Sequence, residues 1–258
     1  MRSSLRSWLT SGLSLLLLVL LWVMLSRVLD SPYMTPLGDV LEAFRRNWLF
    51  TRVLPDVVPS LWRMTGGYLL GVAVGVVVGC ILGRIRVLGL AFAPTIEFVR
   101  SIPPIAIIPA FVIVIGTGDL SKVLIIALGA TMPVLMNTFD GVRSVDPTLS
   151  DYSRVFRLRR RERISIAFRS ASPQIFAGAR TALAIAFILM VTSEMMASTN
   201  GIGYFVLISQ RTFAVPDMWS GILLLGFLGA LFNMIFVLLE RGLLAWYRGY
   251  KSLQQSGE

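Results

Sequence analysis

Apolar runs separated by short charged segments most tightly constrain how this chain can fold. No water pairs with exposed backbone polar groups in a bilayer core, so runs of about 20 apolar residues cross it as helices. The chain is 55% hydrophobic and 15% charged, whereas soluble domains average about 25% charged residues. The sequence therefore predicts an all-α polytopic membrane protein with six transmembrane helices, over residues 13–25, 61–83, 87–115, 122–142, 174–197 and 218–239.

The positive charge predicts how these helices are oriented. The formal net charge is +10, and the arginines gather at the ends of the apolar runs. Cytoplasmic loops carry an excess of Lys and Arg, so we expect both termini and the basic loop 143–172 in the cytoplasm. Orientation explains the charge better than nucleic-acid binding does, and we expect no nucleic-acid partner.

Several enzyme classes lack their characteristic residues here. The chain has no histidine and one cysteine, Cys80, which excludes HExxH metalloprotease chemistry, a Ser–His pair and an internal disulfide. The segment from Gly116 to Lys122 comes nearest to a GxxxxGK[ST] phosphate loop, but its spacing is wrong and no hydroxyl follows the lysine. We therefore expect no catalytic residue, no metal ligand and no ATP binding by that motif.

Glycines recur every four residues along the run 61–83. Residues four apart share one helix face, so the helix carries a strip without side chains formed by Gly67, Gly71, Gly75, Gly79 and Gly83. Such strips let a second helix approach closely in lipid. We expect this helix to be closely packed rather than to line a pore.

Charged residues and prolines interrupt the run 87–115. Glu97 and Arg100 are three residues apart and can pair on one helix face. A charge near the middle of the bilayer costs on the order of 3 kcal/mol, so the pair should face protein or water. Pro103 and Pro104 follow, and proline-broken helices with paired charges often line transport routes. A structural ion pair that fixes helix packing explains these residues equally well.

Two segments between the runs are too polar or too short to span. Residues 30–59 include an amphipathic piece, 37–50, and are expected to form an external, partly helical connection. Residues 204–216 are expected to form an external re-entrant or surface segment.

The basic loop 143–172 holds eight arginines. A short helix can begin near Asp151, and it would place Tyr152, Val155 and Phe156 on one face with arginines around them. Such a helix can lie in a groove of a partner protein or on anionic lipid. Periodicity does not separate these two possibilities.

Four segments between residues 57 and 240 form a recognisable series. They are Glu97-Phe98-Val99-Arg100-Ser101-Ile102-Pro103-Pro104, Gly116-x-Gly118-Asp119-x-Ser121-Lys122, Gly141-Val142-Arg143-Ser144-Val145-Asp146, and Ser193-Glu194-Met195 with Gly201-x-Gly203-Tyr204. In type, order and spacing they resemble the permease subunits of bacterial ABC importers. The resemblance is to the branch that takes up nitrate, sulfonates, taurine and related small solutes.

The cytoplasmic pattern of that family, E-A-A-x3-G-x9-I-x-L-P, is altered in this chain. The tripeptide Asp151-Tyr152-Ser153 stands where Glu-Ala-Ala would be, and Arg157 stands where the glycine would be. Residues 166–169 stand at the I-x-L-P end, one residue short. Glycine permits a turn after the coupling helix, so arginine there changes the turn or lets the helix run on. Ser172-Pro173 still matches the expected opening of the fifth span.

The resemblance implies a type I ABC importer permease-like fold in the bacterial cytoplasmic (inner) membrane. It divides the chain into an N-terminal helix with its external connection (1–56), a core permease domain (57–240) and a cytoplasmic tail (241–258). The implied function is that of the transmembrane subunit of an ATP-driven importer, not an enzyme itself, which forms the pathway for a small anionic or heterocyclic solute. A degenerate non-transporting partner subunit, a passive channel and an intramembrane enzyme are the alternatives.

The resemblance also implies partners and site residues. The partners are two ABC ATPase subunits, which hold ATP and Mg, a second permease subunit, a periplasmic or lipid-anchored solute-binding protein, and membrane lipid; this chain itself is expected to bind no cofactor. The ATPase is expected to dock on Asp151, Tyr152, Ser153, Val155, Phe156, Arg157, Arg160 and Arg161. The candidates for the pathway or gate are Glu97, Arg100, Pro103, Pro104 and Glu194.

Overall fold

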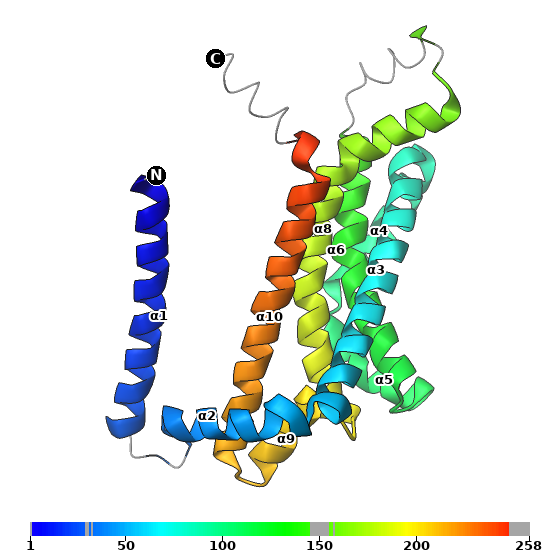
Figure 1. Ribbon diagram of the computed structural model, residues 1–258. Helices are drawn as coiled ribbons and strands as arrows, with labels where there is room; N and C mark the ends of the chain where they lie inside the picture. The colour runs from blue at the N-terminus through cyan, green and yellow to red at the C-terminus, as the bar shows by residue number, and fades with distance from the viewer. Residues whose placement is uncertain (1, 29–30, 32, 145–154, 157, 248–258) are drawn as a thin grey trace.

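The computed structural model describes residues 2–28, 31, 33–144, 155–156 and 158–247, and these residues form helices and turns without a strand. In chain order the elements are α1 (Arg2–Val28), α2 (Leu37–Arg46), η1 (Asn47–Thr51), η2 (Val53–Val57), α3 (Val58–Arg84), α4 (Arg86–Ser101), η3 (Pro104–Ile107), α5 (Ile108–Ile115), α6 (Asp119–Arg143), α8 (Arg160–Ala197), α9 (Ile202–Arg211) and α10 (Val215–Leu243). Helices α3, α6, α8 and α10 run side by side, while α2 and α9 lie across one end (Figure 1). That end is called the α9 end below, and the opposite end, where α6 finishes and α8 begins, is called the loop end.

Four described helical segments are long and apolar enough to cross a membrane, namely Val53–Arg84, Asp119–Arg143, Phe168–Ala197 and Val215–Leu243. A fifth span is added if α4 and the η3–α5 segment count as one bent element. The helical, multi-pass character predicted from the sequence is confirmed. The sixth expected span, residues 13–25, lies within α1, and the count of six stays a prediction.

The run 87–115 is a helix broken at its prolines, as the sequence predicted. It changes direction by 82° between Ser101 and Pro104. Ile102 and Pro103 are extended, with ψ angles of 120° and 124°. Prolines 103 and 104 have no N–H for a helical bond, and a residue before proline disfavours the helical conformation. The chain therefore leaves α4 here and restarts at Pro104.

Helix α8 begins 14 residues earlier than the predicted start at residue 174, so Ser172-Pro173 does not open it. The Glu162 carboxylate accepts the Arg159 N–H at 2.7 Å and caps the true start. Pro173 lies inside the helix, where its missing N–H frees the carbonyl of residue 169. The Ser172 hydroxyl bonds that carbonyl at 2.7 Å. The first turns of α8 lie across the loop end before the helix turns along the bundle (Figure 1).

The glycine strip of α3 packs directly on α6, which confirms the prediction of close packing. A Cβ added to Gly71 or Gly79 would lie 2.6 or 2.7 Å from a carbonyl oxygen of α6. A Cβ at Gly67 or Gly75 would lie 2.7 Å from a side-chain Cβ of the same helix. No real side chain fits at such distances, so glycine is required for the two backbones to approach.

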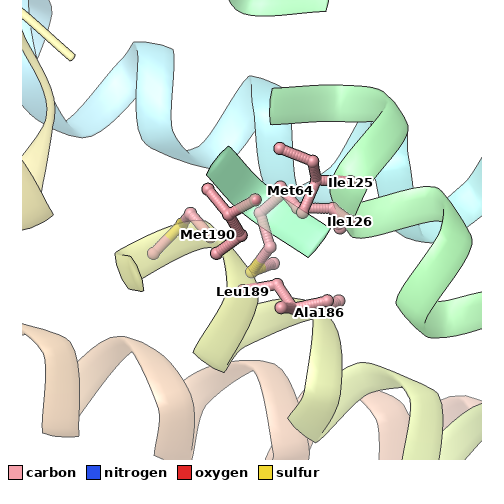
Figure 2. Close-up of a cluster of buried hydrophobic side chains, with 7 residues drawn as sticks. Met64, Ile125, Ile126, Ala186, Leu189 and Met190 are labelled. Carbon is pink, nitrogen blue, oxygen red and sulfur yellow. The ribbon is translucent and has the colours of Figure 1, made fainter. Parts of the chain in front are cut away.

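An apolar core fills the space between α3, α5, α6 and α8. Figure 2 shows Met64 of α3 beside residues of α6 and α8 that are all almost fully buried, namely Ile125, Ile126, Ala186, Leu189 and Met190. Ile108, the first residue of α5, belongs to the same cluster. The bent α4–α5 element is therefore anchored to the bundle at its second half.

The α9 end is closed by the amphipathic segment that the sequence predicted at residues 37–50. Val40, Ala43 and Trp48 are buried, and the Trp48 indole N–H donates to the Ser220 hydroxyl at 3.1 Å. Helix α9 buries one face against its neighbours, including Phe205, which meets the Trp48 ring at 4.8 Å. Residues 202–211 thus form a packed surface helix, consistent with a segment that does not span.

Helix α1 stands apart from the bundle along most of its length (Figure 1). It is joined to α10 by Trp22, whose ring packs edge-on against Trp219 at 4.5 Å. The two indole N–H groups donate to the carbonyls of Thr35 and Tyr33. Tryptophans gather at membrane–water interfaces, so this contact indicates where the α9 end meets the membrane surface.

Candidate functional site

Glu97 and Arg100 form the ion pair that their spacing predicts. Nη2 of Arg100 lies 2.6 Å from Oε1 of Glu97 in the last turns of α4. The side chain of Arg100 is 54% exposed, and that of Glu97 is 61% exposed. Half-exposed charges in an apolar segment must meet water or another protein rather than lipid.

A groove opens beside this pair, at the bend between α4 and η3. Its volume is about 350 Å³, and its walls come from α4, η3, α6 and α8. Among the lining residues only Arg100 carries a charge, and the others include Pro104, Met132, Met136, Asn137 and Ile185. Pro103 lies at the bend itself. The structure therefore brings Arg100, Glu97, Pro103 and Pro104 together at the opening of one groove, called the α4–α6 groove below.

Glu194 does not join this group, because it is buried at the α9 end of the bundle. Its side chain is 0% exposed, and that of its partner Arg63 is 3% exposed. Nη1 of Arg63 donates to Oε1 of Glu194 at 2.9 Å, and the Ser60 hydroxyl lies 2.8 Å from the same oxygen. A buried charge is tolerated only when it is paired and hydrogen-bonded, and Glu194 meets both conditions.

Arg63 connects three parts of the chain. Besides Glu194 of α8, its guanidinium contacts Asp119 at the start of α6 at 2.7 Å. It also donates to the side-chain oxygen of Asn200 at 2.6 Å and to the carbonyl of that residue at 3.3 Å. The α9 ends of α3, α6 and α8 are thus held by one guanidinium.

The first N–H groups of α9 are capped by side chains from η2, α3 and α8. Gly201 N–H donates to Asp56 at 2.8 Å, Ile202 N–H to the Ser60 hydroxyl at 3.0 Å, and Gly203 N–H to Glu194 at 3.0 Å. Helix N-termini need such acceptors because their first N–H groups have no partner within the helix.

The glycine at position 201 makes this arrangement possible. Its φ angle is +114°, and a Cβ there would lie 2.5 Å from the carboxyl carbon of Glu194. Asn200-Gly201-Ile202-Gly203 is therefore more than a turn signal, because its backbone wraps around a buried carboxylate. The importance of Arg63 was missed from the sequence, although a single arginine in the first turns of an apolar run was a visible signal.

The proposed ATPase-docking segment is described in part. Val155 and Phe156 are exposed, as a contact surface requires, and so is Arg161 in the first turn of α8. Arg160 is the first residue of α8. The remaining docking candidates, Asp151, Tyr152, Ser153 and Arg157, lie outside the described residues.

Apolar membrane-length helices, closely packed through glycine, define a multi-pass membrane protein. Comparison with known families finds a match over residues 71–248 to the family described as "Binding-protein-dependent transport system inner membrane component". The chain belongs to this family, and its relatives are permease subunits of binding-protein-dependent ABC importers. It is accordingly a multi-pass inner-membrane component of such a transport system.

Three curated relatives are named for the solutes that they carry. The chain is 33% identical over 218 residues to a putative aliphatic sulfonates transport permease of Bacillus subtilis, a match that covers 84% of this chain and 79% of the relative. It is 33% identical to a nitrate import permease of Synechococcus elongatus, over 58% of this chain and 54% of the relative. It is 26% identical to a bicarbonate transport permease of the same organism, over 73% and 69%.

Proposed function

We propose that this permease subunit forms the translocation pathway for a small anionic solute. The observation that carries the proposal is Arg100, the one charged residue that lines the α4–α6 groove. A guanidinium matches the geometry of sulfonate and carboxylate groups with two parallel hydrogen bonds. The three relatives named above transport sulfonates, nitrate and bicarbonate, which are all small oxyanions.

A second permease subunit completes this pathway. The Glu97–Arg100 pair is more than half exposed, although it belongs to the bent α4–η3–α5 element, which taken as a whole is long and apolar enough to span a membrane. Because exposure of this pair to lipid is unfavourable, a second copy or a related subunit faces it across a water-filled route.

Two separate ATPase subunits, which hold ATP and Mg, drive the transport. They dock on residues 151–161 of this chain in the cytoplasm. Both termini of the chain lie on the same side of the membrane, and the chain crosses the membrane six times. Binding of nucleotide favours the outward-facing state because the closed ATPase dimer binds it more tightly. A periplasmic or lipid-anchored binding protein delivers the solute at the α9 end.

Helix α8 can transmit the movement of the ATPase in one piece. It has 38 residues, which corresponds to about 57 Å at 1.5 Å per residue. It starts next to the docking segment and carries Glu194 close to its far end. A displacement at the loop end therefore reaches the α9 end along one continuous helix, which changes direction where its first turns leave the loop end (Figure 1).

Uptake measurements in cells that produce the complete transporter test the proposed substrate class. The probes are a labelled alkanesulfonate, nitrate and bicarbonate, each offered to the unaltered transporter, to Arg100→Gln and to Glu97→Gln. We expect uptake of one of these anions to fall at least tenfold in Arg100→Gln, the equivalent of about 1.4 kcal/mol. Glu97→Gln should retain uptake, because it leaves the guanidinium free.

The proposal is wrong if Arg100→Gln transports the anion at the unaltered rate while the protein is produced at the normal level. A fall in both variants would instead assign the pair to helix packing. The variant Arg157→Gly examines the alternative of a non-transporting subunit. Unchanged ATPase coupling in that variant would show that the altered docking pattern has no functional consequence.

A further inference from the structure

A second groove lies between α8 and α10 and shares no residue with the α4–α6 groove. Its volume is about 350 Å³. Its lining includes Arg180, Leu183, Phe187 and Ile188 of α8 with Phe232 and Asn233 of α10. It is called the α8–α10 groove below.

The polarity of this groove changes along the length of the two helices. Helices α8 and α10 are antiparallel (Figure 1), yet on both of them the polar lining residue is nearer the loop end. On α8 the lining runs from Arg180 to Ile188, and on α10 it runs from Asn233 to Gly229. Eight residues of helix correspond to about 12 Å, and half the thickness of a bilayer core is about 15 Å. The groove therefore has the length and polarity of one lipid in one leaflet.

A pair of opposite charges stands at the polar end of the groove. Nη2 of Arg180 lies 2.6 Å from Oε2 of Glu240, and the side chains of the two residues are 47% and 24% exposed. The guanidinium carbon lies 5.9 Å from the centre of the Phe236 ring. A guanidinium has five N–H donors, and this one makes a single described hydrogen bond within the chain. Four donors remain for a ligand.

We propose that the α8–α10 groove binds a zwitterionic phospholipid that carries a primary ammonium group. The phosphate lies on Arg180, the ammonium lies on Glu240, and an acyl chain lies against Phe187, Ile188 and Phe232. The Asn233 amide, which makes no hydrogen bond among the described residues, faces the ester carbonyls. A purely anionic head group fits less well because it brings negative charge to Glu240. Basic pockets between membrane helices bind the phosphate groups of anionic lipids, and the added carboxylate of Glu240 is what favours a head group with an ammonium here.

Bound lipid on the intact purified transporter tests this proposal. The complex is equilibrated in bilayers that contain equal amounts of phosphatidylethanolamine and phosphatidylglycerol, extracted in mild detergent, and analysed for retained phospholipid by mass spectrometry. The unaltered protein should retain phosphatidylethanolamine in preference. Arg180→Gln should lower the retention of both lipids about fivefold, close to the value of one arginine at a membrane surface.

Glu240→Gln is the decisive variant, because it removes the partner of the ammonium group and leaves Arg180 in place. It should reverse the preference in favour of phosphatidylglycerol, and it decides the matter even if Arg180→Gln does not fold. Arg241→Gln, at the next and exposed position of α10, is the control and should retain lipid as the unaltered protein does.

Two results would overturn the proposal. Absence of retained phospholipid would show that another surface, such as a second subunit, covers the groove. A preference that stays the same in Glu240→Gln would show that the charge pair does not select the head group. Since retained lipid is measured independently of uptake, a failure here is distinguishable from a failure of the proposed transport function.

Discussion

Replacement of Arg63 by methionine should destabilise this protein far more than removal of an exposed arginine. Arg63 and Glu194 have side chains that are 3% and 0% exposed, and the same guanidinium also bonds Asp119 and Asn200. Loss of one partner of a buried ion pair costs about 3–5 kcal/mol, because the other charge stays buried without compensation. In Arg63→Met, Glu194 would keep the hydrogen bonds from Ser60 and Gly203 but would lose its counter-charge.

Arg100→Met is the matched control for this prediction. It removes the same side chain from another arginine–glutamate pair, but one whose members are 54% and 61% exposed. Exposed pairs contribute about 0–1 kcal/mol. The two variants thus remove the same side chain from an arginine–glutamate pair, and they differ in burial and in the additional contacts of Arg63 to Asp119 and Asn200.

Thermal unfolding of the purified protein in detergent, followed by tryptophan fluorescence, compares the two variants. For a chain of this size about 1 kcal/mol corresponds to 2–4 °C in the midpoint. We expect a fall of about 6–20 °C for Arg63→Met and of less than about 4 °C for Arg100→Met. Adding Glu194→Gln to Arg63→Met should recover part of the loss, because it removes the uncompensated charge. Equal midpoints for Arg63→Met and Arg100→Met would refute the argument.

Three further predictions concern packing and coupling. Gly71→Leu should prevent accumulation of folded protein because a Cβ at that position would lie 2.6 Å from a backbone oxygen of α6. Gly66→Leu is the control and should accumulate normally in membranes, because a Cβ there would have no neighbouring atom within 4 Å. Gly201→Ala should lower the thermal midpoint by several degrees, since it combines a left-handed φ of +114° with a clash against Glu194; an unchanged midpoint would argue against the wrapped carboxylate. Phe156→Ser should leave the thermal midpoint unchanged because the side chain is exposed. It should reduce the extent to which the solute-binding protein stimulates ATP hydrolysis by the ATPase subunits. Normal stimulation would show that Phe156 is not part of the docking surface.

The sequence alone predicts those parts of this fold that depend on local spacing. The four-residue recurrence of glycine in α3 correctly indicates close helix packing, because a helix face is a property of neighbouring turns. The three-residue spacing of Glu97 and Arg100 predicts their ion pair for the same reason. Apolar runs reveal the membrane helices because the bilayer imposes length and hydrophobicity on each one separately.

The buried network at the α9 end was not predictable in this way. Arg63 and Glu194 are 131 residues apart in the chain, and no local pattern links them. The pairing results from the packing of α3 on α6 and of α6 on α8, which brings the ends of these helices together. Glu194 was recognised through the segment Ser193-Glu194-Met195 of the family resemblance, without its partner Arg63, and its place in the pathway stays a prediction.

One element boundary was misjudged because proline acts differently in different surroundings. Pro173 suggested a helix start, but the Ser172 hydroxyl compensates for the hydrogen bond that proline removes, and α8 continues through it. Pro103 and Pro104 have no such compensation among the described hydrogen bonds, and the chain turns by 82° there. The outcome depends on neighbouring acceptors and donors that the proline positions alone do not specify.

We propose above all that separate ATP-hydrolysing subunits drive the conformational changes of this chain. The most direct test is uptake of solute by proteoliposomes that contain the chain with its copurified partners, in the presence of the solute-binding protein. We predict that ATP on the side of the membrane that carries the ATPase subunits drives accumulation of solute on that side. A nonhydrolysable ATP analogue should not do so. Failure to recover any ATPase with the chain, or equal solute flux with and without ATP, would contradict the account.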